Sequence, residues 1–463
     1  MSDLKTELTG FAGTTLQPGD VGYDDARAVF NGLIDRRPAL IARCTSAADV
    51  AAAVRFGRAE GLEISVYGGG HSVTGAAVCD EGLCIDLRGL KTTSVDPAAR
   101  LLRAGGGLTW GELDAATQEH GLAVTGGRVP TTGVGGLSLG SGSGWLERAF
   151  GFTCDNLVEV EVVTAAGEIV TASETENPDL FWALRGGGGN FGIVTTFTLR
   201  LHPLGPIVFG GMLVYPGFRG AEVLKAYRDF TASAPDEVGS GLAFITAPHE
   251  EFVPEPARGH PAIGIICCYT GDPADGPAAY QPLIDLGPAM AMVQPMPYVA
   301  VQQLIEPANP KGRLNYWTAD FYSALPDEAC DTLAAQATQP VSPYTQIIVV
   351  PGGGALSRVS DASMAFGSRD AAFNIHYLSM WEDPAETARN TDYTRALAGS
   401  MKPWSTGTAY LNFLGDEGRG RVEASFGPEK FARLQQIKAV WDPDNLFHVN
   451  QNIPPAPTLP LQR

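Results

Sequence analysis

Short apolar strands alternate with helices along the first 205 residues of the chain. β-branched and apolar runs predict strands at residues 38–42, 64–66, 83–87, 94–96, 101–104, 157–164, 169–172 and 193–201. Amphipathic runs predict helices at residues 47–60, 110–120 and 180–184, the first of them behind the capping pair Thr45-Ser46. This alternation is typical of an α+β or α/β domain that binds a cofactor.

The pattern changes after Pro203 and Pro206. Longer, well-separated strands are predicted at residues 208–214, 241–246, 263–269, 314–322, 346–350 and 373–380. Helices are predicted between many of them, at residues 222–233, 278–286, 327–337 and 384–397. We therefore expect a mostly antiparallel sheet with helices on one face. The last part of the chain predicts a short strand at 410–413, a helix at 428–441 and a polar, proline-rich segment that closes back over the first domain.

Glycine clusters interrupt the first domain at residues 68–70, 105–107, 133–144 and 186–192. Residues 65–72, Ser-Val-Tyr-Gly-Gly-Gly-His-Ser, end a predicted strand in three glycines and His71. Each glycine inside a regular element costs about 1 kcal/mol, so a ligand contacted by backbone amides is the usual compensation. The clusters predict a large flat cofactor held by the main chain, with His71 beside it. Gly187, Gly189 and Gly192 fit the spacing of a dinucleotide-binding fingerprint. They follow a predicted helix and precede a predicted strand, however, whereas the fingerprint follows a strand and precedes a helix, so we reject a Rossmann site here.

Composition narrows the classes of partner. The formal net charge of -19 argues against nucleic acid, whose binding rests on clustered Lys and Arg. The sequence has no long apolar run, and residues 1–7 lack a signal-peptide pattern, so we expect a cytoplasmic protein that does not bind membranes. The seven cysteines form no CxxC pair and are predicted to be core thiols, and the histidines have no metal-binding spacing.

Several motifs, taken together and in order, resemble one family. They are Gly68-Gly69-Gly70-His71-Ser72, Gly133-Val134-Gly135-Gly136, Asp155-Asn156-Leu157, the run 177–192, Tyr410 with Asn412, and Asp442-Pro443 through Pro454. The sequence resembles the bacterial berberine-bridge-enzyme-like FAD-linked oxidases, within the vanillyl-alcohol-oxidase superfamily that has PCMH-type FAD-binding domains. The resemblance implies an α+β chain with an FAD-binding domain at 1–205 (PCMH-type core 36–204), a substrate domain at 206–405 and a C-terminal segment at 406–463 that returns to the FAD domain.

The resemblance also implies how FAD is held. His71 matches the histidine that the family joins to the flavin 8α-methyl carbon, whereas Val129 stands where many members carry a second, cysteinyl linkage. FAD attached through His71 only, with no 6-S-cysteinyl bond, is therefore expected. Leu137 replaces a family histidine. The implied cofactor contacts are Tyr67, Gly68, Gly69, Gly70, His71, Ser72, Gly127, Val129, Thr131, Thr132, Gly133, Gly136, Leu137, Gly140, Gly142, Gly192, Ile193, Val194, Tyr410, Asn412, Asn450 and Gln451.

Three residues are candidates for catalytic roles. Thr132 falls at the family's oxygen gatekeeper and is small enough to favour O2 as acceptor. Tyr410 matches a tyrosine that acts as base in several relatives, a role that requires a lowered pKa; alternatively it is only a wall or a hydrogen-bond partner of the flavin. Arg358 lies near the place of a glutamate in alkaloid-oxidising members and would favour an anionic or carbonyl-rich substrate.

Other positions leave alternatives open. Ser143 stands where some relatives carry a second tyrosine, which makes a two-tyrosine mechanism doubtful. Tyr316, His376 and Tyr377 lie on predicted strands of the substrate domain, but neighbouring strand residues face opposite ways, so His376 and Tyr377 cannot both line a pocket.

The leading hypothesis is an FAD-dependent oxidase that takes hydride from an alcohol or activated carbon of a small secondary metabolite or sugar and reduces O2 to H2O2. The alternatives are a flavin-dependent oxygenating enzyme that acts on a polyketide-like substrate, and a flavin-binding protein without turnover. We expect a small-molecule substrate and O2 as the partners, no metal, and a monomer or homodimer.

Overall fold

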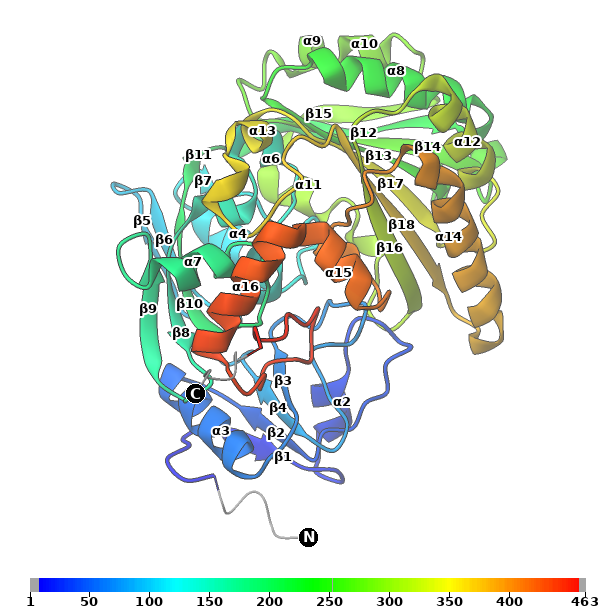
Figure 1. Cartoon of the computed structure of the whole chain (residues 1–463). Coiled ribbons are helices and arrows are strands. Elements are labelled where there is room, and N and C mark those ends of the chain that lie inside the picture. The colour runs from blue at the N-terminus through cyan, green and yellow to red at the C-terminus, as the bar shows by residue number, and fades with distance from the viewer. Residues whose placement is uncertain (1–7, 252, 458–463) are drawn as a thin grey trace.

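The computed structural model describes residues 8–251 and 253–457, so the N-terminal stretch 1–7 lies outside the described residues. A four-stranded sheet comes first, at the bottom of Figure 1, with helix α2 (Tyr23–Arg27) beside it. Its strand order is β1 (Thr14–Leu16), β2 (Leu40–Arg43), β4 (Leu83–Asp86), β3 (Ile64–Tyr67), and β2 and β3 both run parallel to β4. Helix α3 (Ala47–Ala59) begins as predicted, because the Ser46 side chain accepts a hydrogen bond from the Asp49 amide.

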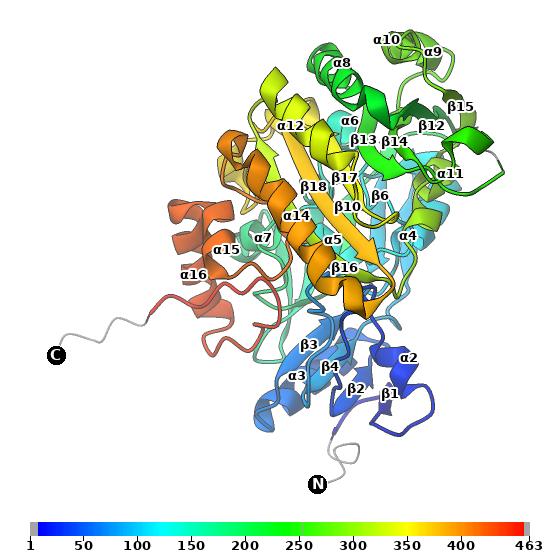
Figure 2. The ribbon, with the colours of Figure 1, turned by 90° about the vertical axis from the view of Figure 1, so that its right-hand side faces the viewer.

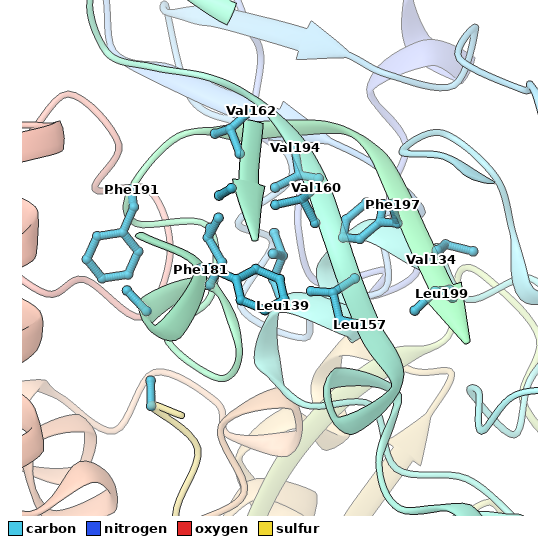
Figure 3. Packing of buried hydrophobic residues seen from close by; sticks show 14 of the residues in the cluster. Val134, Leu139, Leu157, Val160, Val162, Phe181, Phe191, Val194, Phe197 and Leu199 are labelled. Carbon is cyan, nitrogen blue, oxygen red and sulfur yellow. The ribbon is translucent and has the colours of Figure 1, made fainter. Parts of the chain in front are cut away.

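An antiparallel five-stranded sheet follows. Its order is β5 (Thr93–Asp96), β6 (Leu101–Gly105), β10 (Ile193–Arg200), β8 (Leu157–Val163), β9 (Ile169–Ser173), so the predicted hairpin of β8 and β9 is confirmed. Helices of this part are α4 (Trp110–Gln118), α5 (Val134–Gly140), α6 (Glu147–Phe150) and α7 (Pro178–Leu184). Figure 3 shows the core beneath α5, where Val134 and Leu139 lie in one buried cluster with Val160 and Phe197 of the sheet. This cluster fixes α5, and with it the glycine-rich segment around residues 133–144.

The largest sheet has seven strands, all antiparallel. Its order is β15 (Met290–Pro297), β12 (Ile207–Pro216), β14 (Pro261–Tyr269), β13 (Val238–Thr246), β17 (Gln346–Pro351), β18 (Phe373–Trp381), β16 (Leu314–Tyr322). The helices α8 (Gly220–Ser233), α12 (Asp327–Ala337) and α14 (Thr387–Met401) cover one face, as Figures 1 and 2 show. The expectation of an antiparallel sheet with helices on one face is confirmed.

Some elements differ from the sequence-based expectation. Strand β15 was not predicted; it contains Pro295 and ends at Pro297, and it lies at the edge of the sheet, where proline is tolerated. The predicted helix 278–286 is two short helices, α9 (Gly276–Ala279) and α10 (Gln281–Ile284), since Pro282 cannot continue a helix. The predicted strand 410–413 is instead a 3₁₀ turn, Leu411–Phe413, and α15 (Arg419–Phe426) was not predicted.

A buried ion pair holds the C-terminal segment against the glycine turn at 186–192. Lys438, on α16 (Pro428–Trp441), pairs with Asp442 at 2.6 Å, and both side chains are 0% exposed. The Lys438 ammonium also donates to the Asn190 carbonyl at 2.6 Å and the Phe447 carbonyl at 2.9 Å. Asn190 in turn accepts a hydrogen bond from the Ile453 amide. The segment around Ile453 is thereby fixed beside the first domain.

We expect Lys438→Met to destabilise the fold strongly, because it leaves the Asp442 carboxylate buried without its partner. Breaking a buried pair on one side costs about 3–5 kcal/mol. The matched control is Arg419→Met, which breaks the exposed pair with Glu423 and costs about 0.5 kcal/mol or less. Urea unfolding of the two variants measures the difference, and equal losses for both would contradict this account of the C-terminal segment.

Candidate functional site

One continuous cavity of about 360 Å³ lies between the first part of the chain, which contains the four-stranded and five-stranded sheets, and the seven-stranded sheet. Its volume falls within the range of about 300–1,000 Å³ that small-molecule and cofactor sites occupy. One side is formed by residues of the glycine clusters and of the C-terminal segment, among them Gly68, Gly136, Gly188 and Asn450. The opposite side comes from β16, β17 and β18. The four sequence clusters therefore meet at one place.

The glycines leave room for a flat ligand against the main chain. A Cβ added at Gly136 or Gly189 would meet no atom within 4 Å, and one at Gly68 would meet only the Gly106 carbonyl oxygen, at 3.8 Å. A side chain at these positions would project into the cavity and take up the space of a ligand. The Asn450 side-chain oxygen, which belongs to the same wall, is buried without a hydrogen-bond partner. The open space beside the glycines fits a large flat ligand, and the unpaired Asn450 oxygen fits a ligand with hydrogen-bond donors, and FAD has both properties.

His71 faces the cavity directly after the first glycine turn. Its Nε2 lies 3.0 Å from the Thr131 hydroxyl, and its ring stacks on Phe30 with 4.5 Å between centroids. Burial, and then the nearby positive charge of Lys311, lower the pKa of His71 to about 4. The imidazole is therefore neutral at pH 7 and keeps a nucleophilic lone pair.

Most of the residues predicted to contact the cofactor line the cavity. They are Gly68, Gly69, Gly70, His71, Ser72, Gly127, Val129, Thr132, Gly133, Gly136, Leu137, Gly140, Gly192, Ile193, Val194, Asn412, Asn450 and Gln451. Four predicted contacts do not line it: Tyr67, Thr131, Gly142 and Tyr410, the last of which borders a separate chamber. Tyr67 packs under the Arg88 guanidinium and donates to the Ala28 carbonyl, and Thr131 is reached through its bond to His71. Gly142 packs against Thr153, where a Cβ would clash.

Aromatic rings form much of the opposite wall. The His376 ring stacks on Phe413 with centroids 4.1 Å apart and meets Trp317 edge-on at 5.0 Å. His376 lies on the cavity side of β18, whereas Tyr377 points away and bonds to the Tyr322 hydroxyl, so the predicted alternation is confirmed. Burial, and then the charge of Arg128, lower the pKa of His376 to about 3. Tyr316 lies outside the cavity, where its hydroxyl accepts a hydrogen bond from Arg395.

The structure contradicts the expected lowering of the Tyr410 pKa. Tyr410 is 2% exposed and borders a separate small chamber rather than the main cavity. Its phenol oxygen accepts hydrogen bonds from the Ser141 hydroxyl and the Ser143 amide, both at 2.9 Å. These bonds favour the phenolate, but burial outweighs them and raises the pKa to about 12. With this pKa the phenol keeps its own proton at neutral pH, so Tyr410 cannot act as a base there.

Arg358 is not part of the site. It ends the short helix α13 (Ala355–Arg358), its side chain is 62% exposed, and it pairs with Asp236 at 2.5 Å. The expectation that Arg358 selects an anionic substrate is therefore wrong. Its position relative to Gly353 and Gly354 suggested a place in the pocket, but Arg358 does not line the cavity.

Arg128 is the charged residue of the wall that sequence reasoning missed. It lines the cavity with a side chain only 9% exposed, donates to the Ser143 hydroxyl at 2.9 Å and stacks on Trp145. Glu147 lies 3.4 Å from the same guanidinium. The sequence could have indicated this role, because Arg128 is the single charged residue in the glycine-rich segment from Gly126 to Gly144. Within the described residues, no cluster of His, Cys, Asp and Glu could hold a metal ion.

Comparison with known proteins places the chain in a family. Residues 38–173 match the model described as an FAD binding domain, and residues 409–454 match the model described as berberine and berberine like. The FAD-linked oxidoreductase YgaK of Bacillus subtilis is 30% identical, over 97% of this chain and 98% of its own. The chain belongs to the berberine-bridge-enzyme-like FAD-linked oxidoreductases.

Two further matches cover the whole of this berberine-bridge-enzyme-like chain. (R)-6-hydroxynicotine oxidase of Paenarthrobacter nicotinovorans is 30% identical, over 98% of this chain and 99% of its own. The crystal structure of 6-hydroxy-D-nicotine oxidase from Arthrobacter nicotinovorans has a TM-score of 0.86 at 28% identity, covering 96% of this chain and 98% of that one. The expected α+β fold, the FAD cofactor and an enzyme of the FAD oxidase type are confirmed. No helix in the described part of this oxidoreductase has the length and hydropathy to span a membrane.

We expect Gly136→Ala to separate cofactor binding from folding. Alanine in α5 stabilises the helix by about 1 kcal/mol, but its methyl group enters the cavity. Forcing an extra methyl against a bound group costs about 1–3 kcal/mol, so FAD affinity falls about tenfold or more. Gly399→Ala in α14 is the control, since a Cβ there also meets nothing within 4 Å. Thermal melting and the flavin-to-protein absorbance ratio of the purified variants should show two stabilised proteins, of which only Gly136→Ala has incorporated less flavin.

Proposed function

We propose that this enzyme oxidises a hydroxyl-bearing or otherwise activated carbon of a small metabolite or sugar, with FAD attached through His71 alone and O2 as the final acceptor. One observation carries the proposal: a single cavity joins His71 and the glycine wall to the aromatic wall of the seven-stranded sheet. A cofactor held on the first wall and a substrate held on the second would then lie in contact. Bound FAD supplies a two-electron acceptor.

The surroundings of His71 support a single covalent link. Its neutral imidazole can act as a nucleophile, and the Thr131 hydroxyl, which engages Nε2, leaves Nδ1 as the attacking atom. Val129, also at the wall, presents only an aliphatic side chain and so cannot form a second bond. In this proposal His71 both anchors the flavin and fixes its orientation toward the opposite wall.

The opposite wall suits a compact, largely apolar substrate with a few polar groups. Trp317, Phe413 and Ile348 supply apolar surface, and the flat His376–Phe413 stack favours a planar or ring-shaped compound. Gln346 and Asn309, which bond to each other at 3.3 Å, offer amide groups to a substrate oxygen. This mixture of apolar rings and amide groups is consistent with a hydroxylated ring as substrate. A highly charged substrate would be disfavoured, because the wall has few charged side chains to compensate for its charge.

Acid precipitation tests the attachment. We expect the wild-type protein to stay yellow in the pellet, while His71→Ala binds FAD only reversibly and releases it into the supernatant. His120→Ala, an exposed histidine just after α4, is the control and should keep acid-stable flavin. Release of flavin from the wild type would disprove the linkage. A screen of hydroxylated compounds with peroxide readout tests the reaction, and incorporation of labelled oxygen without stoichiometric peroxide would point to oxygenation instead.

Thr132 tests the choice of acceptor. Its side chain lines the cavity, and its carbonyl is fixed by the Trp110 amide at 2.9 Å, so a larger residue cannot simply swing away. Thr132→Leu should slow reoxidation of reduced flavin by O2 about tenfold, equivalent to about 1.4 kcal/mol in the barrier, with flavin reduction by substrate nearly unchanged. Thr132→Ser, which keeps the volume small, should reoxidise like the wild type. Stopped-flow absorbance separates the two half-reactions, and equal reoxidation in both variants would remove Thr132 as a gatekeeper.

A further inference from the structure

Oxidation of an alcohol requires a group that accepts the hydroxyl proton, and the cavity wall has few candidates. Among the described residues that line it there is no Asp, Glu, Lys or Tyr. Its protonatable side chains are His71, Arg128 and His376. Arginine stays charged, His71 is the proposed anchor, and a pKa of about 3 makes His376 a weak base. The acceptor must therefore lie behind the wall and be reached through a group on it.

Ser143 is such a group. It borders both the main cavity and a second chamber of about 30 Å³, which is larger than the roughly 10–15 Å³ that one water requires. Its hydroxyl accepts a hydrogen bond from Arg128 at 2.9 Å and donates one to the Glu147 carboxylate at 2.5 Å. A serine oxygen has two acceptor sites, so one remains for the hydroxyl of a substrate.

Glu147 is a buried carboxylate behind Ser143. It is 4% exposed, and its Oε2 atom accepts the Ser143 hydroxyl, accepts the Gly144 amide at 2.9 Å and lies 3.4 Å from Arg128. Burial raises its pKa, while the Arg128 charge and the hydrogen bonds oppose the rise. Glu147 also borders the second chamber, in which a water could carry a proton onward.

We propose that Ser143 and Glu147 form a proton relay for the substrate hydroxyl. The substrate O–H bond breaks as its proton moves to Ser143 Oγ, and the proton of Ser143 moves to Glu147 Oε2. The carbinol carbon becomes a carbonyl carbon as one of its C–H bonds breaks, and that hydrogen would leave with the bonding electron pair as hydride, for which bound FAD would be the acceptor. This inference rests on the proposed alcohol oxidation, and it gives the polar contacts of the glycine-rich segment a catalytic task that Tyr410 cannot perform.

Anaerobic flavin reduction as a function of pH tests the relay. In the wild type the rate should fall as pH drops through the Glu147 pKa, because the relay needs the carboxylate. Glu147→Gln keeps the shape of the side chain but should lower the rate about 10²-fold, within the typical contribution of general base catalysis, and abolish this inflection. Ser143→Ala should lose a similar factor, and the double variant should lose no more than either single one, because both residues act as a unit.

Asp114→Asn is the matched control. Asp114 is also a buried carboxyl with a pKa raised by burial, to about 7, but it bonds to Gln302 and does not touch Ser143. The relay predicts that this variant keeps the inflection. An inflection lost in Asp114→Asn and kept in Glu147→Gln, or additive losses in the double variant, would overturn the relay.

An infrared titration of the holoenzyme tests the relay without substrate. The carboxylic acid band that is missing in Glu147→Gln should emerge only below neutral pH in the wild type, and at higher pH in Ser143→Ala, which loses a hydrogen bond that favours the carboxylate. A protonated Glu147 at pH 7 would overturn the relay even if no alcohol were oxidised. Failure of every hydroxylated substrate to reduce the flavin would instead overturn the proposed function.

Discussion

Main chain packs directly against main chain where the turn after β3 meets the turn before α5. A Cβ on Gly69 would lie 2.1 Å from the Gly133 nitrogen, and a Cβ on Gly133 would lie 2.3 Å from the Gly69 nitrogen. No other residue fits at either position, since real Cβ atoms do not approach backbone so closely. This contact joins the four-stranded sheet to α5, which is itself fixed by the core in Figure 3. The floor of the cavity, and the place of His71 beside it, depend on these two glycines.

Burial sets the protonation of the groups around this floor. Desolvation disfavours the charged form, so it lowers the pKa values of His71 and His376 and raises those of Tyr410 and Glu147. Arg128 forms an ion pair with Glu147 in the same region, at 3.4 Å. The two histidines are therefore neutral and Tyr410 is a phenol at pH 7. In the proposed relay, proton transfer falls to Glu147, whose carboxylate accepts a hydrogen bond from the side chain of the wall residue Ser143.

The sequence predicted correctly those strands, helices and glycine turns that depend on the local pattern of residues. The strand 314–322 and the helix 327–337 have the predicted bounds, because each combines a strong period with clear flanking signals. Most glycines assigned to the cofactor line the cavity, since a glycine has few other reasons to occur in such numbers between strands. The family itself followed from the order of its motifs.

The failures share a physical cause, which is that a motif gives a position in the chain but not its degree of burial. Tyr410 matches a catalytic tyrosine, yet its pKa depends on the rings and amides packed around it, which come from residues far away in the sequence. Arg358 was placed by its distance from two glycines, but at the end of α13 its side chain is 62% exposed and pairs with Asp236. Arg128 was overlooked because its partner, Glu147, lies beyond the glycine-rich segment.

The two walls of the cavity come from separate parts of the chain, and this bears on substrate specificity. The strands β16, β17 and β18 present alternate residues to the cavity, so His376 faces the cavity while Tyr377 belongs to the core beneath the helices. Changes at the cavity-facing positions of these strands alter shape without disturbing that core. The charged groups, in contrast, lie on the segment 127–147, held by glycine packing and by α5. Under the proposed function, substrate shape and proton transfer would therefore be set by separate parts of the chain, and one could change while the other is preserved.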